Sequence, residues 1–276
     1  MKLKNVLLSS IVLIGFSSFA FAQTQIRVDY TANFAETGTG FAPLAGVFHD
    51  GTYSAFAPGT MASPGLEALA EIGNPSQFLS EVPASANFGN TDGQIGGTNR
   101  PLTRSFTVDV APGNSTFSYA SMFLPSNDWF ISNPGGIGLD VASLIGAAPG
   151  TSLSIDIGSI YDAGTELEDF TRGGGTGMDP FDLVPRLSDA DGGNPDDQMD
   201  NISIVPRIAG ENLFADYVNP NSEPIARFLG ASTANLGTIQ LTVVPEPSSS
   251  SLLAFAAFGF LGLVRASKKR VWNHNR

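Results

Sequence analysis

The sequence predicts an all-β protein, built as an antiparallel β-sandwich with long loops and one or two short helices. Several segments alternate apolar and polar residues with a period of two, which is typical of strands that bury one face. Turn-forming residues separate these segments, and the chain contains 31 glycines and 18 prolines. Because strands and helices do not alternate regularly, a doubly wound α/β fold is not expected.

Six segments carry the period-two pattern, and in each the apolar residues share one face. They are QIRVDYTANF (25–34), RSFTVDV (104–110), TFSYASMFL (116–124), SLSIDIGSIY (152–161), NISIVPRI (201–208) and GTIQLTVV (237–244). The expected inward residues are, in order, Ile26, Val28, Tyr30, Ala32 and Phe34; Phe106, Val108 and Val110; Phe117, Tyr119, Ser121 and Phe123; Leu153, Ile155 and Ile157; Ile202 and Ile204; Ile239, Leu241 and Val243. Sequential short strands of this kind favour a sandwich.

Helices are expected in two places. Ser63 is a good N-cap, Pro64 suits a first helical position, and Gly73 ends the apolar period between them. A second helix is expected over residues 138–145. The stretch from Arg172 to Asn201 is rich in glycine and aspartate and predicts a long loop.

The N-terminal end predicts export. Residues 1–22 contain Lys2 and Lys4, a short apolar centre and the sequence Ala20-Phe21-Ala22. This arrangement is typical of a cleaved secretory signal, so the mature protein is expected to begin at Gln23.

The C-terminal end, residues 245–276, has three parts in a fixed order. Pro245-Glu246-Pro247 is followed by an apolar segment over 252–264 and then by a basic cluster: Arg265, Lys268, Lys269 and Arg270. The apolar segment is short for a permanent span, and the basic cluster marks its cytoplasmic side. This order resembles the PEP-CTERM sorting signal of exopolysaccharide-producing Gram-negative bacteria. The resemblance implies transient anchoring and processing by an exosortase in the inner membrane. We therefore expect the body, 23–244, to form one domain outside the cytoplasm.

Charge and cysteine content limit the classes of partner and of stabilising interaction that the protein can have. All 26 acidic residues lie between Gln23 and Glu246, where only seven basic residues occur, so this part has a formal charge of −19. Such a chain repels nucleic acid and attracts divalent cations. Because cysteine is absent, an exported domain must be stabilised by its core or by a hard metal ion.

Three acidic residues follow two predicted strands. Asp128 comes after the strand at 116–124, and Asp162 and Glu166 come after the strand at 152–161. If both strands end at the same rim, three carboxylates converge, and hard oxygens in this number suit Ca²⁺ better than Mg²⁺. The alternative is that each is a solvated loop carboxylate.

A resemblance favours the calcium site. LPSNDWFISN (124–133) and IYDAGTELED (160–169) resemble the spondin N-terminal domain, as do His49-Asp50, Gly59 and the run from Ala62 to Glu71. The similarity covers roughly residues 25–185, is strongest with bacterial members, and implies an antiparallel sandwich that binds calcium. By this resemblance Asp128, Asp162 and Glu166 are the ligands. Asn127, Tyr161 and Glu166 depart from the proline, tryptophan and aspartate of the family pattern.

Three further groups of residues suggest other functions: the pair Trp129 and Phe130, His49, and the acidic stretch from Asp189 to Asp200. Trp129 and Phe130 could form a ligand rim that stacks on sugars, although core packing beneath the metal loop is favoured. His49 is the only histidine outside the basic tail, and without a nucleophile elbow it is interpreted as structural. The acidic stretch Asp189 to Asp200 lacks the order of an EF-hand and is interpreted as a solvated loop.

We therefore expect an exported, calcium-binding protein that is not an enzyme. Its role would be structural or adhesive at the cell surface or in the extracellular polysaccharide matrix. Expected partners are the processing enzyme and either exopolysaccharide or a surface protein, but not nucleic acid. A carbohydrate-binding module is the alternative, and a secreted hydrolase using a carboxylate pair is a weaker one.

Overall fold

The computed structural model describes residues 23–33, 40–96, 100–124, 126, 128–165, 200–205 and 235–246. The predicted signal at 1–22, the apolar and basic parts of the C-terminal end, and Glu166 lie outside these ranges. So does the long loop predicted for 172–201, apart from Asp200 and Asn201.

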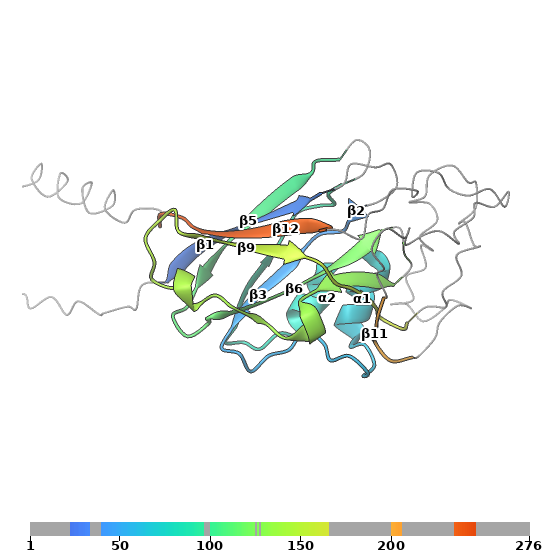
Figure 1. The fold of residues 1–276 in the computed structure, drawn as a ribbon. Coiled ribbons are helices and arrows are strands. Elements are labelled where there is room, and N and C mark those ends of the chain that lie inside the picture. The colour runs from blue at the N-terminus through green and yellow to red at the C-terminus, as the bar shows by residue number, and fades with distance from the viewer. Residues whose placement is uncertain are drawn as a thin grey trace, which may run out of the picture.

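The described residues form a sandwich of two antiparallel sheets, which confirms the predicted fold class (Figure 1). The smaller sheet has the order β5-β1-β12-β9, and the larger one has the order β11-β10-β7-β6-β3-β4, with β2 and β8 also paired to β6. The strands are β1 (Thr24–Ala32), β2 (Gly40–Phe41), β3 (Ala45–His49), β4 (Asn87–Asn90), β5 (Thr103–Val110), β6 (Thr116–Leu124), β7 (Trp129–Ser132), β8 (Leu139–Asp140), β9 (Ser152–Ile157), β10 (Ile160–Asp162), β11 (Ser203–Ile204) and β12 (Gly237–Val243).

The main core lies between the two sheets and contains the alternating residues that the sequence predicts. Ile26, Val28 and Tyr30 of β1 are fully buried, as are Ile239 and Leu241 of its neighbour β12. The predicted inward faces of β1, β6 and β12 are confirmed wherever they are described, because their apolar residues belong to this core.

A second core explains why β6 is more buried than expected. The sequence predicts one buried face, yet eight of its nine residues are buried. Helices α1 (Pro64–Ile72) and α2 (Pro75–Ser80) cover the outer face of the larger sheet, where Ala120, Phe130 and Tyr161 pack against helical side chains. The fold is therefore a sandwich with a helical layer on one side.

Helix α1 begins and ends as the sequence predicts. The Ser63 hydroxyl accepts a hydrogen bond from the Leu66 N–H, and Gly73 ends the helix with a φ of 66°. The carboxylate of Glu81, just after α2, accepts hydrogen bonds from the Ser63 hydroxyl and the Gly65 N–H, both at 2.6 Å. Helix α2 was not predicted.

Two predicted elements are corrected, and Ile204, expected to face inward, is 61% exposed in β11. The helix expected over 138–145 is replaced by β8 and a 3-10 turn, Ala142–Leu144, because pairing of Leu139 and Asp140 with β6 holds the chain extended. The segment 152–161 is not one strand: β9 pairs with β12, whereas β10 pairs with β7 in the other sheet. The chain changes sheets at Gly158 and Ser159.

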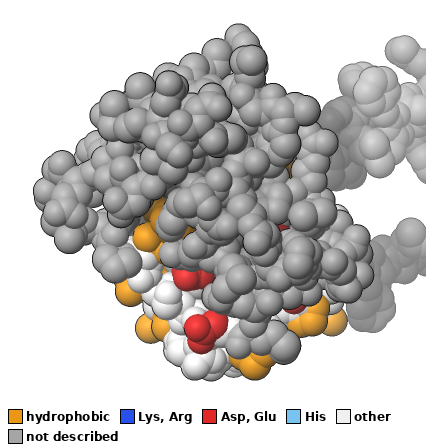
Figure 2. All heavy atoms as spheres, turned by 90° about the vertical axis from the view of Figure 1, so that its right-hand side faces the viewer, with side chains coloured by type: hydrophobic (Ala, Val, Ile, Leu, Met, Phe, Trp, Pro, Cys, Tyr) orange, Lys and Arg blue, Asp and Glu red, His pale blue; other side chains and the backbone are white. Residues whose placement is uncertain are grey.

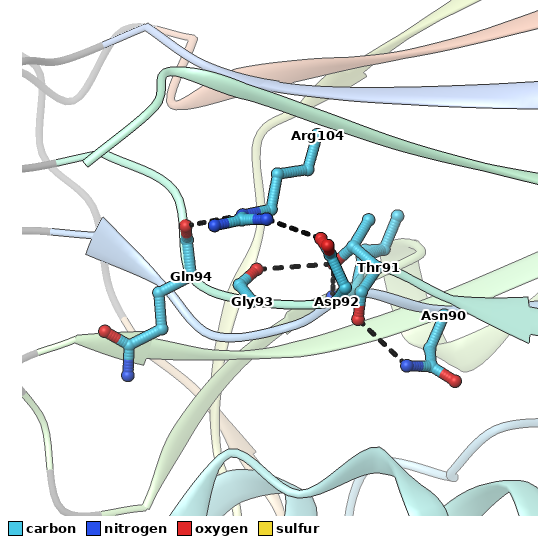
Figure 3. Close-up of polar contacts among 7 residues, drawn as sticks. Asn90, Thr91, Asp92, Gly93, Gln94 and Arg104 are labelled. Carbon is cyan, nitrogen blue, oxygen red and sulfur yellow. Dashed lines mark hydrogen bonds and ion pairs between the residues drawn. The ribbon is translucent and has the colours of Figure 1, made fainter.

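The loop after β4 is fastened to the smaller sheet by Arg104 of β5. Its guanidinium group donates to the carbonyl of Gln94 and forms an ion pair with Asp92 (Figure 3). The Thr91 hydroxyl in the same loop accepts the N–H of Leu44 at 2.9 Å. This polar cluster therefore joins the two sheets at their β4–β5 side.

Both ends of the described body lie at one end of the sandwich. The Val244 N–H donates to the Gln25 carbonyl at 2.9 Å, so the start of β1 and the end of β12 are neighbours. The strand β11 lies at the opposite end (Figure 1). Asp162 pairs with Ser203 of β11, which places the predicted metal site at the end of the sandwich away from Gln25 and Val244.

Candidate metal centre

A buried turn between β6 and β7 holds Asp128. The Ser126 hydroxyl donates to the Phe123 carbonyl and accepts the Trp129 N–H at 2.9 Å. These contacts link the end of β6 to the start of β7. The side chain of Asp128 is fully buried, which is unusual for a carboxylate and indicates a specific local role.

Strand pairing brings Asp162 to Asp128. In the β10–β7 ladder Asp162 lies opposite Trp129, the neighbour of Asp128, and the Ala163 N–H donates to the Asp128 carbonyl at 3.2 Å. The sequence predicted that the two acids meet at a common rim, and in the structure they do. The predicted third ligand, Glu166, lies outside the described residues.

The residues after Asp162 wrap around both carboxylates. The Gly164 N–H donates to Oδ1 of Asp162 at 2.7 Å, and the Thr165 N–H donates to Oδ2 of Asp128 at 3.0 Å. Gly164 has a φ of 69°, a left-handed conformation that glycine adopts without strain. The Ala-Gly turn is therefore what aims two backbone donors at the acids.

Asp200, which is far from Gly164 in the sequence, contacts the turn at Gly164. Its N–H donates to the Gly164 carbonyl at 2.8 Å, and a Cβ on Gly164 would lie only 2.9 Å from the Asp200 carbonyl oxygen. Ile202 exchanges hydrogen bonds with Gly59 and Thr60, which fixes this segment to a second loop. The sequence does not predict Asp200 in the site, because nothing in the order of residues indicates its contact with Gly164.

The electrostatics of the centre favour either a proton or a cation. Burial raises the pKa of Asp162, and the charge of Asp200 acts in the same direction. Hydrogen bonds to Asp162 from the Gly164 N–H and with the Asp128 side chain oppose this rise in pKa. Figure 2 looks onto this end of the molecule; among the described side chains visible there, Asp and Glu are present and Lys and Arg are not.

The donor set fits a hard metal ion. A buried carboxylate, Asp128, and a half-buried one, Asp162, supply anionic oxygens side by side, which is the chemistry that Ca²⁺ prefers. The Thr165 hydroxyl oxygen is buried and has no hydrogen-bond partner in the described part of the chain. Within that same part, no group of three or more His, Cys, Asp or Glu residues is close enough to hold a metal ion. Asp128 and Asp162 alone would therefore leave a metal ion in need of further oxygen ligands.

The aromatic residues beside Asp128 are core side chains, as the sequence favoured, and they do not form the alternative ligand rim. Trp129 is 3% exposed and packs between the sheets, whereas Phe130 is fully buried on the helical side with Phe56 and Tyr161. Successive residues of a strand face opposite sides, so each ring fills a different core. Neither ring can stack on a sugar in this conformation.

His49 has a structural environment. It is 2% exposed, its Nε2 lies 3.0 Å from the Ser118 hydroxyl, and its Nδ1 accepts the Gly51 N–H at 3.1 Å. Ser118 is itself fully buried, so this pair of side chains has no access to a substrate.

The C-terminal segment predicted to be a sorting signal is described only at its start. Pro245 and Glu246 are exposed and follow β12 directly, whereas Pro247 and the basic cluster lie outside the described residues. None of the helices in the described ranges is long and apolar enough to cross a membrane. The predicted apolar segment at 252–264 was not part of that search.

Comparison with known families decides the identity of the fold. The model of the Spondin_N family matches residues 18–167, which is more than half of the chain. The chain belongs to the spondin N-terminal family. A search of curated proteins found no match.

The family match covers the centre but not all of its surroundings. Asp128, Asp162, Thr165 and Glu166 of this spondin-type domain lie within the matched residues, whereas Asp200 and β12 lie beyond them. The family is one of extracellular domains of a binding or adhesion type, which agrees with the predicted export.

Proposed function

We propose that this spondin-type domain is an exported calcium-binding protein with a structural or adhesive role at the cell surface or in the extracellular polysaccharide matrix. The observation that carries the proposal is the approach of Asp162, which is half-buried, to the fully buried Asp128 at the end of the β10–β7 ladder. Two ionised carboxylates in contact repel one another unless a cation or a shared proton lies between them.

Calcium would act here as a fastening between loops. Asp128 belongs to the β6–β7 turn and Asp162 to the end of β10, so an ion held by both would fix one loop against the other. The ion supplies positive charge between these oxygens. Because it binds the folded chain and not the unfolded one, it raises the free energy of unfolding.

The test is a calorimetric titration of the purified protein with Ca²⁺, together with thermal unfolding. We expect saturable binding and a higher melting temperature in calcium than in chelator. Asp162→Asn should lose both effects. Asp109→Asn is a matched control, because Asp109 is an exposed aspartate of β5 that bonds Gln25 at the other end of the sandwich. Equal melting temperatures of the parent protein with and without calcium would disprove the proposal.

The arrangement of the chain ends supports a display role. Because Gln25 and Val244 are neighbours at one end and β11 lies at the other, a protein held through its C-terminal segment would present the metal centre away from the attachment. We propose that this segment is the PEP-CTERM signal and that an exosortase-type enzyme processes it. Mass spectrometry of the exported protein should find a C-terminus near Pro245, and an intact basic cluster would contradict this.

A polysaccharide or a surface protein is the proposed partner. The burial of Trp129 and Phe130 removes the aromatic platform on which a sugar-binding module would depend. Pull-down with the purified exopolysaccharide, with and without calcium, tests this part of the proposal. Retention that is lost in chelator is expected if the calcium-ordered loops form the binding surface.

A further inference from the structure

The hydroxyl of Thr165 is an unexplained buried polar group. The residue as a whole is half-buried, but its Oγ1 is shielded from solvent and has no hydrogen-bond partner among the described residues. Burying a hydroxyl without a hydrogen-bond partner is unfavourable, because the group loses its hydrogen bonds to water. Such a group in a native structure therefore calls for an explanation, such as a bound ion or water.

The position of Thr165 points to an ion. Its backbone N–H donates to Oδ2 of Asp128, so the residue is attached directly to one of the two proposed ligands. It lies three residues after Asp162, on the far side of the left-handed Gly164, whose N–H holds the Asp162 carboxylate. The orphaned hydroxyl thus belongs to the same turn that organises both acids.

We propose that Oγ1 of Thr165 is a neutral oxygen ligand of the ion held by Asp128 and Asp162. This inference rests on the calcium site proposed above and adds a ligand to it. Ca²⁺ accepts 6 to 8 oxygen ligands, so two carboxylates leave positions to fill. Thr165 would serve twice, because its N–H orients the Asp128 carboxylate while its hydroxyl contributes an oxygen.

The test compares two variants with opposite predictions. Thr165→Val keeps the shape and the N–H but removes the hydroxyl, and Thr165→Ser keeps the hydroxyl. Calcium affinity of the purified protein is measured by calorimetry, and the melting temperature is measured in chelator and in calcium. We expect Thr165→Val to bind Ca²⁺ about tenfold or more weakly, as for other losses at a metal site, and Thr165→Ser to bind as the parent does.

The stability measurement separates a ligand from a structural side chain. In chelator, Thr165→Val should melt at the same temperature as the parent or higher, because it removes an unsatisfied buried hydroxyl. In calcium it should melt lower. An unchanged calcium affinity in Thr165→Val would overturn the inference alone, and so would an equal loss of stability with and without calcium. If the parent protein binds no calcium, both the inference and the proposed function fail.

Discussion

The side chains of Asp128 and Asp162 lie close enough to share a hydrogen bond, at the point where the β10–β7 ladder ends. A hydrogen bond between two carboxyl groups requires a proton on one of them. Without a shared proton or a cation between them, two ionised carboxylates side by side repel one another, so their charge is unfavourable at neutral pH. The first prediction follows from this contact.

Without calcium, Asp162 should make the protein less stable as the pH rises. Its pKa in the folded state is raised above the unfolded value of about 3.9, chiefly by burial. The stabilisation by the bound proton is complete below about pH 3.9 and is lost as the pH rises through the raised pKa. In chelator at pH 7.5, Asp162→Asn should therefore unfold at a higher urea concentration than the parent.

Calcium should reverse that order. At pH 7.5 with saturating Ca²⁺ the parent should be the more stable protein, because the variant has lost a ligand. Urea unfolding of both proteins, in chelator and in calcium, gives the four midpoints that this requires. A parent that is more stable than Asp162→Asn in chelator as well would show that the aspartate has a structural role independent of the ion.

His49 should produce the opposite pH dependence, at the other end of the sandwich. Burial lowers its pKa below the ordinary value, partly offset by the nearby charge of Asp50. Since Nδ1 accepts the Gly51 N–H, protonation of the ring would place the Nδ1–H of His49 against the N–H of Gly51. The stabilisation that the neutral His49 ring provides is complete above about pH 6.5, and it is lost as the pH falls toward the lowered pKa.

The measurement is the urea midpoint between pH 7.5 and 5 in the parent and in His49→Gln. The parent should lose stability on acidification and the variant should lose less of it. Asp50 is exposed and Tyr53 meets the ring of His49 edge-on, and neither changes its charge in this range. Identical slopes in the two proteins would rule out His49 as the titrating group.

Asn133 should be essential for stability although it touches no ligand. Its side chain accepts the Tyr119 N–H at 2.9 Å and donates to the Phe117 carbonyl at 3.2 Å. These two bonds lie on β6 where its pairing changes from β8 to β7. Asn133→Ala would leave two buried backbone groups unsatisfied, so we expect a loss of about 2–4 kcal/mol. Asn90→Ala is the control: Asn90 is exposed and its side chain donates to the Thr91 carbonyl, so less than about 1 kcal/mol should be lost.

Gly65 of α1 should resist the substitution that usually strengthens a helix. An alanine Cβ there would lie 2.6 Å from the carboxylate carbon of Glu81, which caps the helix. Although Gly→Ala in a helix is commonly favourable by up to about 1 kcal/mol, Gly65→Ala should lower the melting temperature by displacing this cap. In the Glu81→Ala background the same change should no longer destabilise, and a double-mutant cycle measures the difference.

The sequence predicts those features of the structure that depend on residues close together in the chain. The inward faces of β1 and β12 and the caps of α1 follow from periods and turn chemistry, which act between near neighbours in the chain. The helix expected over 138–145 failed because pairing with β6, a tertiary interaction, outweighs local propensity. The break within 152–161 was missed because β9 and β10 continue the same apolar pattern while belonging to different sheets.

The packing of the two sheets shows what a one-dimensional pattern omits. Gly46 and Gly89 face each other across β3 and β4, and the ring of Phe106 lies over both; a Cβ on either glycine would come within 2.8 Å of it. No spacing in the sequence relates these three residues. The contact exists because the twist of two sheets brings β5 over the β3–β4 pair.

The sequence by itself determined the fold class and the acidic character, and it singled out the two aspartates of the centre, because each follows from composition, period or a short motif. Only the tertiary structure decided that these aspartates touch, that Trp129 and Phe130 fill opposite cores, and that Thr165 and Asp200 surround the site. The physical reason is that strand register and loop closure set such distances, and both depend on residues far apart in the chain.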